Sequence, residues 1–272
     1  RIPERSGVDL LIRTAADLER LTGTPVLGQT PLIPGRSQAD RLHYLIEKPN
    51  SAAAEAVRNL RTSVLLSDGG GSTRVIMVTS SVPDEGKTTQ VVALAQNFAA
   101  LGKRVLLIEG DIRRPGISEF LSRKPGGTLL SVLSGAALPQ DCVHHDAASG
   151  VDLLVGEPSP VSAADLFSTP AWSGLLDWAR DQYQVILVDT PPVLVVPDAR
   201  VIGQQADVIL YAVQWDKTAP AQVQDGLRML ASVGLKVSGL VLSQVDPRGM
   251  RRYGLASSSG AYARYGQPYF EG

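Results

Sequence analysis

The chain has 272 residues, of which 44% are hydrophobic and 19% charged, and its formal net charge is −1. This length and composition suit one large α/β domain with short additional segments, since single cores stop growing near about 250 residues. The balanced charge excludes a general attraction to nucleic acid, which we therefore do not expect as a partner. The single cysteine, Cys142, excludes an internal disulfide. All apolar runs are shorter than the ~18 residues that a membrane helix needs.

Residues 1–50 have the pattern of a lead-in segment before the main domain. A short helical pattern over 15–21 is followed by a proline-spaced stretch. From 51 to 66, apolar residues recur every three or four positions, which predicts an amphipathic helix with Ser51 as its N-cap. A glycine-rich linker follows over 68–72. Because the chain does not begin with methionine, we expect further sequence upstream.

The rest of the chain alternates between short apolar runs and helical patterns. Runs that are apolar throughout are typical of strands covered on both faces, as in a parallel sheet. We expect strands over 75–79, 104–108, 152–155, 185–189, 208–213 and 237–242, and helices over 87–101 and 221–233. This order predicts a doubly wound α/β sandwich with helices on both faces of a mostly parallel sheet. Ligands of such sheets bind beyond the carboxyl ends of the strands.

The turn after the first of these strands carries most of a phosphate-binding loop, which is written G-x-x-x-x-G-K-[ST]. Ser81 stands where the first glycine is expected, and the glycine-lysine-threonine end is intact. A loop of this kind wraps backbone N–H groups around phosphate oxygens at a helix N-terminus. The alternative is a Gly-Lys-Thr helix start that binds no ligand. We expect a nucleoside triphosphate to be bound by Ser81, Glu85, Gly86, Lys87, Thr88 and Thr89.

Carboxylates follow two further strands. Asp189 ends the strand 185–189, where a Mg²⁺ ligand is expected next to the Thr88 hydroxyl; the alternative is an aspartate that only caps a turn. Glu109 and Asp111 stand two residues apart and would project on the same side of an extended backbone. One would bind Mg²⁺ and the other would accept a proton from an incoming hydroxyl, unless the pair is a solvated acidic turn. No other metal is expected, since His144 and its neighbours lack the spacing of a zinc site.

The C-terminal stretch 251–272 holds four of the seven tyrosines, namely Tyr253, Tyr262, Tyr265 and Tyr269. Glycine, serine and alanine interleave with them and the apolar period is absent, which predicts a mobile, exposed tail. Core packing does not account for tyrosines in such a tail. A docking tail without chemistry is the alternative interpretation.

Together these motifs resemble the bacterial tyrosine kinases, or BY-kinases, which control capsular and extracellular polysaccharide assembly and use a P-loop fold. In that family 81–88 would be the Walker A motif, 108–113 the Walker A′ motif and 185–189 the Walker B motif. The resemblance implies a MinD/ParA-like three-layer sandwich with ATP and Mg²⁺ as cofactors. It also implies three parts: a juxtamembrane segment over 1–50, the P-loop kinase domain over 51–250 and the tyrosine tail over 251–272.

The resemblance extends to the helix 51–66. Glu55, Arg58 and Arg61 form the E-x-x-R-x-x-R pattern that the family associates with packing of subunits into a ring, an octamer being one candidate size. By spacing alone, a charged stripe is a solvated helix face. The opening segment is similar to the stretch that follows the last membrane helix in relatives with a chain-length-regulator module. The intact protein would then be membrane-anchored, with this part in the cytoplasm.

The function that the resemblance implies is autophosphorylation of tail tyrosines on a neighbouring subunit of the ring. Lys87 would neutralise the phosphates, and Thr88, Asp111 and Asp189 would bind Mg²⁺. Glu109 would be the base, although the family usually has aspartate there. The implied further partners are polysaccharide assembly proteins and a tyrosine phosphatase.

Two other functions remain open. One is a MinD- or ParA-like ATPase switch, although the extra lysine those proteins carry near the loop start is missing. The other is a nucleotide-binding pseudokinase that regulates polysaccharide export. Glu109 motivates the second, as does Ser243, which stands where relatives often carry an asparagine linked to the adenine pocket.

Overall fold

The computed structural model describes residues 11–66, 74–117, 126–159 and 161–253. In these ranges one eight-stranded sheet crosses the molecule in the order β1-β8-β7-β2-β6-β3-β5-β4. The strands are β1 (Val26–Pro31), β2 (Arg74–Ser80), β3 (Val105–Glu109), β4 (His144–Asp146), β5 (Val151–Leu154), β6 (Val185–Asp189), β7 (Val208–Gln214) and β8 (Gly239–Val245). Neighbouring strands pair in parallel except β4, which is antiparallel to β5. The predicted doubly wound, mostly parallel sheet is confirmed.

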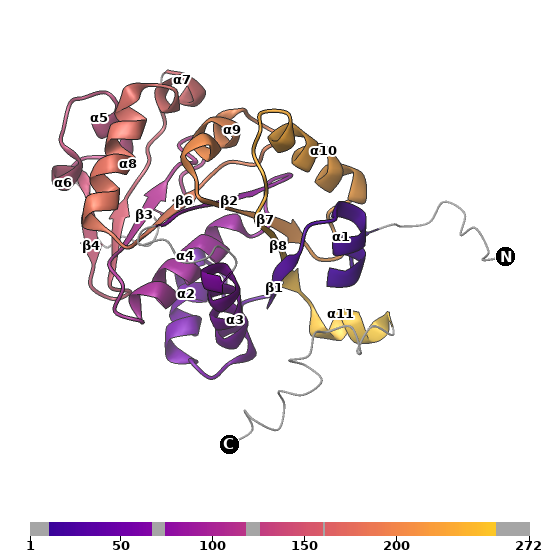
Figure 1. Cartoon of the computed structure of the whole chain (residues 1–272). Coiled ribbons are helices and arrows are strands. Elements are labelled where there is room, and N and C mark those ends of the chain that lie inside the picture. The colour runs from indigo at the N-terminus through magenta and orange to yellow at the C-terminus, as the bar shows by residue number, and fades with distance from the viewer. Residues whose placement is uncertain (1–10, 67–73, 118–125, 160, 254–272) are drawn as a thin grey trace.

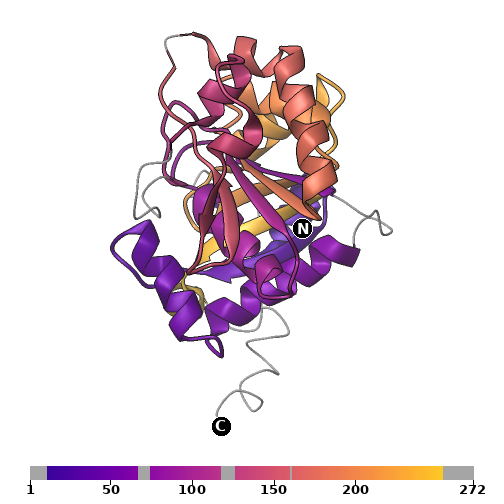
Figure 2. The ribbon, with the colours of Figure 1, turned by 90° about the vertical axis from the view of Figure 1, so that its left-hand side faces the viewer.

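Helices cover both faces of this sheet, which gives three layers (Figures 1 and 2). On one side lie α2 (Gln38–Glu47), α3 (Ala52–Leu66) and α4 (Lys87–Ala99). On the other lie α5 (Leu129–Leu133), α7 (Ala163–Phe167), α8 (Pro170–Gln182), α9 (Asp198–Ile202) and α10 (Pro220–Ala231). The remaining helices are α1 (Ala15–Thr22), α6 (Pro139–Cys142), the short 3₁₀ turn Gly203–Gln205 and α11 (Pro247–Arg252).

Alternate side chains of the central strand β2 enter two separate cores. Ile76 and Val78 pack with α3 and α4, whereas Met77 packs on the opposite face with Trp172 and Leu176 of α8. Burial on both faces is why these strands are apolar throughout. The P-loop therefore follows a strand that is fixed from both sides.

The stretch over 26–31, for which the sequence pattern predicted no strand, forms the edge strand β1. It pairs with β8, and the amide of Leu32 donates to the carbonyl of Val245 at 3.1 Å. Gly28 allows the close approach of α3, because a Cβ there would lie 3.0 Å from Leu60 Cδ1. This part of the lead-in segment therefore belongs to the sheet.

The helix predicted over 51–66 is confirmed as α3. Ser51 accepts a hydrogen bond from the amide of Ala54 at 3.2 Å, as expected of an N-cap. The predicted apolar face, with Val57 and Leu60 at its centre, is buried. Two elements were not predicted: the helix α8, and the short strand β4 that contains His144.

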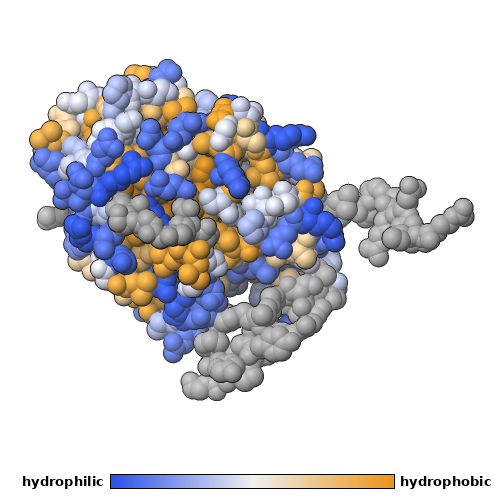
Figure 3. All heavy atoms as spheres, viewed as in Figure 1, coloured by the Kyte–Doolittle hydropathy of each residue, from blue (hydrophilic) through white to orange (hydrophobic). Residues whose placement is uncertain are grey.

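The face seen in Figure 3 is largely hydrophilic, with hydrophobic residues gathered in patches between hydrophilic ones. Within the described ranges, the helices are all too short or too polar to cross a membrane.

Candidate nucleotide-binding site

The P-loop is shaped by a buried carboxylate. One oxygen of Glu85 accepts from the amide of Val82 at 2.8 Å and the other from the Thr218 hydroxyl at 2.5 Å. The Glu85 side chain is fully buried, and burial raises its pKa. Gly86, the N-cap of α4, has a φ of +83°, a conformation that favours glycine. Glu85 was predicted to contact the nucleotide, but its carboxylate is turned inward and supports the loop.

Ser81 occupies the place of the first P-loop glycine and has a structural partner. Its hydroxyl lies 2.8 Å from the Tyr211 hydroxyl of β7, and both side chains are buried. The carbonyl of Ser81 accepts from the amide of Leu194 at 3.2 Å. The serine hydroxyl thus connects the loop to β7, which a glycine cannot do, and the backbone carbonyl connects the loop to the chain after β6.

The pair Thr88 and Asp189 has the form of a Mg²⁺ site. The Thr88 hydroxyl donates to Asp189 Oδ2 at 2.7 Å, and the other oxygen, Oδ1, is buried with no hydrogen-bond partner in the part of the chain that the structure describes. Burial raises the pKa of Asp189 to about 7, against the opposing effect of Lys87. A buried carboxylate oxygen without a partner is costly. These residues therefore fit a bound divalent cation.

A cavity of about 260 Å³ opens beside this pair. Its walls are the P-loop, the turn with Asp111 and Arg113 that follows β3, and the chain after β6 around Val195. Arg113 donates to Asp198 at 2.9 and 3.4 Å, so two walls of the cavity are joined. The Asp111 carboxylate accepts from the amide of Arg114 at 3.1 Å, and burial raises its pKa. Lys87, Thr88 and Asp111, which the sequence analysis placed at the nucleotide and Mg²⁺ site, all line this cavity.

Glu109 does not line this cavity. The sequence pattern predicted Glu109 and Asp111 facing one site, but the chain leaves the strand between them. The amide of Gly110 donates to the carbonyl of Asp189 at 2.8 Å, and a Cβ on Gly110 would lie 2.7 Å from that oxygen. Only Asp111 therefore faces the cavity, and Glu109 is fully buried at the end of β3.

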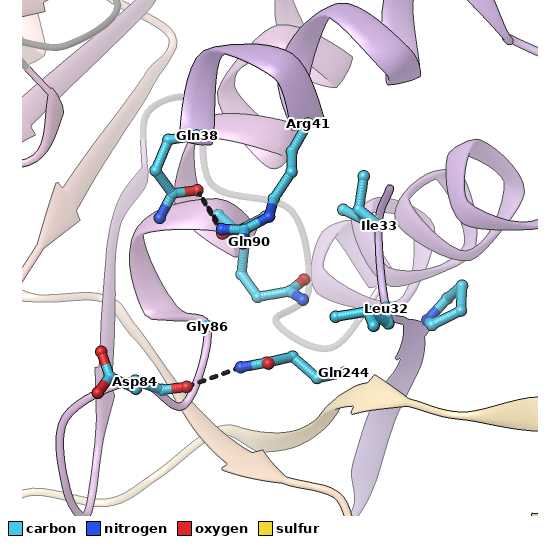
Figure 4. A pocket seen from close by; sticks show the side chains of 10 residues that line it. Leu32, Ile33, Gln38, Arg41, Asp84, Gly86, Gln90 and Gln244 are labelled. Carbon is cyan, nitrogen blue, oxygen red and sulfur yellow. Dashed lines mark hydrogen bonds between the residues drawn. The ribbon is translucent and has the colours of Figure 1, made fainter. Parts of the chain in front are cut away.

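Figure 4 shows a second cavity, of about 180 Å³. It adjoins the first cavity and shares Gln38, Asp84 and Gly86 with it. Leu32 and Gln90 line it, and Gln90 Oε1 is buried without a partner among the described residues. This cavity was not predicted, because β1 and α2 supply much of its wall.

The residues after the P-loop and after β8 meet around the second cavity. Thr89, expected at the nucleotide, donates its hydroxyl hydrogen to Gln38 at 2.7 Å. The side-chain amide of Gln244 donates to the carbonyl of Asp84 at 2.7 Å (Figure 4). Ser243 is buried, and its hydroxyl donates to the carbonyl of Glu85 at 2.6 Å. Ser243 therefore connects β8 to the P-loop, and Gln244 is the residue that lines the cavity.

The residues predicted at a subunit interface make contacts within this chain. Arg58 pairs with Glu55 and also donates to the carbonyl of Pro49 at 2.8 Å. Arg61 donates to the Asn97 side chain of α4 at 2.7 Å. The stripe is therefore half-buried and ordered by contacts inside one subunit.

Tyr253 is the predicted phosphoacceptor that the structure describes, and it is docked on the body of the protein. Its hydroxyl donates to Asp216 Oδ2 at 3.0 Å, and the Arg13 guanidinium lies 4.0 Å from the ring centroid. The other three, Tyr262, Tyr265 and Tyr269, lie outside the described residues.

The mostly parallel sheet, the P-loop and the Thr88–Asp189 pair define a protein with the P-loop NTPase fold. A family model described as an AAA domain matches residues 73–238. The succinoglycan biosynthesis transport protein ExoP of Rhizobium meliloti is 31% identical over 84% of this chain and 29% of its own length. The tyrosine-protein kinase Wzc of Salmonella typhimurium is 30% identical over 77% of this chain and 29% of its own.

Solved structures extend this likeness. The kinase domain of the Escherichia coli tyrosine kinase ETK matches with a TM-score of 0.78 and 26% identity, over 88% of this chain and 95% of that domain. The septum site-determining protein MinD of Pyrococcus horikoshii shares the fold, with a TM-score of 0.54 and 22% identity over 62% of this chain and 70% of its own. The chain belongs to the bacterial tyrosine kinase family, as the sequence motifs indicated. It spans about a third of the length of the curated relatives it matches.

Proposed function

We propose that this chain is the kinase domain of a protein-tyrosine autokinase that transfers the γ-phosphoryl group of ATP to tyrosine. The observation that carries the proposal is the Thr88–Asp189 pair beside buried Lys87, with one carboxylate oxygen lacking a partner, in a chain related to named tyrosine kinases. Phosphoryl transfer needs little covalent participation by the protein, so positioning and charge stabilisation are what the residues must supply.

Each residue of the first cavity has a role that its position supports. The N–H groups at the start of α4 and the Lys87 ammonium bind and neutralise the phosphates. Thr88, Asp189 and Asp111 supply the oxygen ligands that Mg²⁺ prefers. When bound, Mg²⁺ neutralises charge on the β- and γ-phosphates. Asp111 is the carboxylate that faces an incoming phenol, because Glu109 is turned away from the cavity.

The second cavity is suited to the nucleoside. Leu32 and Ile33 offer apolar surface beside the P-loop, and Gln90 Oε1 offers an acceptor for an exocyclic amine such as that of adenine. The cavity continues from the phosphate site by way of Gln38 and Gly86, so one ligand spans both.

The proposed acceptors are the tail tyrosines of a neighbouring subunit in a homo-oligomeric ring formed through α3. Several phosphates on one tail, each carrying about −1.5 to −2 charge, would repel their neighbours and disassemble the ring. The proposed biological role is control of capsular or extracellular polysaccharide synthesis and export. The chain would act on the cytoplasmic side of a membrane, attached to a chain-length-regulator module and opposed by a tyrosine phosphatase.

Tyr253 should be phosphorylated far less than the other tail tyrosines. Its hydroxyl donates to Asp216, and a phosphate there would face that carboxylate at close range. After incubation with Mg²⁺-ATP, site-resolved mass spectrometry should find an occupancy on Tyr253 that is less than about a tenth of that on Tyr262, Tyr265 or Tyr269. Asp216→Asn should raise the Tyr253 occupancy. Equal occupancy of all four in the unaltered chain would contradict this role of the contact.

Mg²⁺-dependent nucleotide binding should weaken on acidification. Burial raises the Asp189 pKa from 3.8 to about 7, so below pH 7 a proton occupies the carboxylate that Mg²⁺ needs. Between pH 8 and pH 6 the affinity gained on adding Mg²⁺ should fall about tenfold, since each pH unit below the pKa costs a factor of about ten. Titrations with and without Mg²⁺ distinguish the protonation of Asp189 from the protonation of the nucleotide. Asp189→Asn should abolish the pH-dependent part.

Incubation of the chain with Mg²⁺-ATP, followed by mass spectrometry of tyrosine phosphate, tests the proposal. Phosphate on tail tyrosines is the expected result. ATP hydrolysis without tyrosine phosphate would instead assign the chain to the ATPase switches, and nucleotide binding without either activity would make it a pseudokinase.

A further inference from the structure

Glu109 has unusual contacts for a residue in a catalytic motif. Its Oε1 accepts from the amides of Gly116 and Ile117, both at 2.5 Å, and its Oε2 accepts from the amide of Gly156 at 2.8 Å. Both carboxylate oxygens are thus used by backbone donors, and the side chain is fully buried. The contacts join the end of β3 to two segments, one after Asp111 and the other after β5.

The first of these segments is the turn that carries the cavity-lining side chains. The chain passes from Asp111 through Arg113 and Arg114 and returns to the end of β3 at Gly116. The contact with Glu109 closes this turn on one side, and the ion pair of Arg113 with Asp198 fixes it on the other. The position of Asp111 relative to Asp189 therefore depends on the Glu109 contact.

We infer that Glu109 is a positioning residue that holds Asp111 against the metal and nucleotide site, and that it does not accept the substrate proton. The part of this inference that concerns catalysis rests on the proposed function. A carboxylate with three backbone donors and no open face has no path to a phenol in the cavity. Charged acceptors make strong hydrogen bonds, so one carboxylate can hold two loops at once.

The length of the glutamate side chain is part of this arrangement. Aspartate is shorter by one methylene, roughly 1.5 Å, and misplacement on that scale can cost about 10²-fold in rate. Gly156 can approach Glu109 this closely because it has no side chain: a Cβ there would lie 3.0 Å from the carbonyl oxygen of Glu109. Replacing Glu109 by the aspartate usual in the family should therefore lower activity in this chain.

Three variants test the inference: Glu109→Asp, Glu109→Gln and Gly156→Ala. Amide hydrogen exchange measures the contacts of Glu109 with the two segments. In the variants, the protection of the Ile117 and Gly156 amides against exchange should fall at least tenfold. Binding of a fluorescent ADP analogue measures the site. Without Mg²⁺ its affinity should stay within about twofold, because the P-loop is intact, whereas the gain on adding Mg²⁺ should fall about tenfold. Autophosphorylation by Glu109→Asp should fall about 10²-fold, and excess Mg²⁺ should restore part of it.

Glu19→Asp is the matched control. Glu19 also accepts from a backbone amide, that of Val26 at 2.8 Å, but far from the cavity. The Glu19→Asp variant should show the same gain in nucleotide affinity on adding Mg²⁺ as the unaltered chain.

Two results would overturn the inference. One is Glu109→Asp with equal or higher autophosphorylation and an unchanged Mg²⁺-dependent gain. The other is Glu109→Gln that abolishes phosphorylation while amide protection and the Mg²⁺-dependent gain stay as in the unaltered chain, because Glu109 would then act as the base. A chain that does not phosphorylate tyrosine would refute the proposed function. Amide exchange and binding of the ADP analogue need no phosphoryl transfer, so they would still test whether Glu109 positions Asp111.

Discussion

Replacing Lys87 by methionine should reduce autophosphorylation about 10³-fold, the upper range for removing one group that stabilises transition-state charge. Lys87 is only 8% exposed at the start of α4 and lines the phosphate cavity. Methionine has a similar length and no charge, so the fold should be retained while the phosphates lose their cation. Phosphotyrosine measured by mass spectrometry at saturating Mg²⁺-ATP gives the rate.

Lys103→Met is the matched control, because Lys103 is exposed in the turn between α4 and β3 and does not line the cavity. It should phosphorylate at the rate of the unaltered chain. Equal rates for both variants would show that the P-loop lysine takes no part in the transfer. An unchanged nucleotide affinity in Lys87→Met would limit its role to the transfer step.

Asp189→Asn should produce opposite effects on activity and stability. The rate should fall about 10² to 10³-fold, because the buried carboxylate that would bind Mg²⁺ becomes a neutral amide. The nucleotide-free protein should become more stable at pH 8. The raised pKa means that the folded state disfavours the ionised carboxylate, a cost that develops above pH 3.8 and is complete above about pH 7. The asparagine oxygen can still accept from Thr88.

The gain in the free energy of unfolding should be on the order of 2 kcal/mol at pH 8, after allowance for the lost attraction to Lys87, and smaller at pH 5. Denaturant unfolding without Mg²⁺ and nucleotide measures it. Asp177→Asn is the control, since this carboxylate is 77% exposed on α8. Loss of activity with an equal loss of stability would mean that Asp189 is structural.

The strands and the metal pair could be predicted because their signals are local. An all-apolar run such as 185–189 indicates a buried strand, and the residue that ends it is brought to the P-loop by the order of a doubly wound sheet. Asp189 and Thr88 lie 2.7 Å apart for this reason. The helix α8 was missed although its signal was present, with Pro170 at its first turn and apolar residues at helical spacing.

Other features depend on tertiary contacts that no local pattern carries. β1 contains a glycine and ends at a proline, and only pairing with β8 makes it a strand. The inward turn of Glu85 depends on Thr218, and that of Glu109 on Gly156, each far away in the sequence. Local spacing predicted Glu109 and Asp111 on one side of an extended chain, and the contact of Gly110 with Asp189 ends that extended conformation.

Transfer of phosphate between two differently marked chains tests the central claim most directly. The donor chain carries Tyr262→Phe, Tyr265→Phe and Tyr269→Phe, and the isotope-labelled acceptor chain carries Lys87→Met with its tyrosines intact. After mixing with Mg²⁺-ATP, mass spectrometry should find phosphate on Tyr262, Tyr265 or Tyr269 of the labelled chain. Absence of tyrosine phosphate on the labelled chain, with Mg²⁺-ATP shown to bind the donor, would contradict the account.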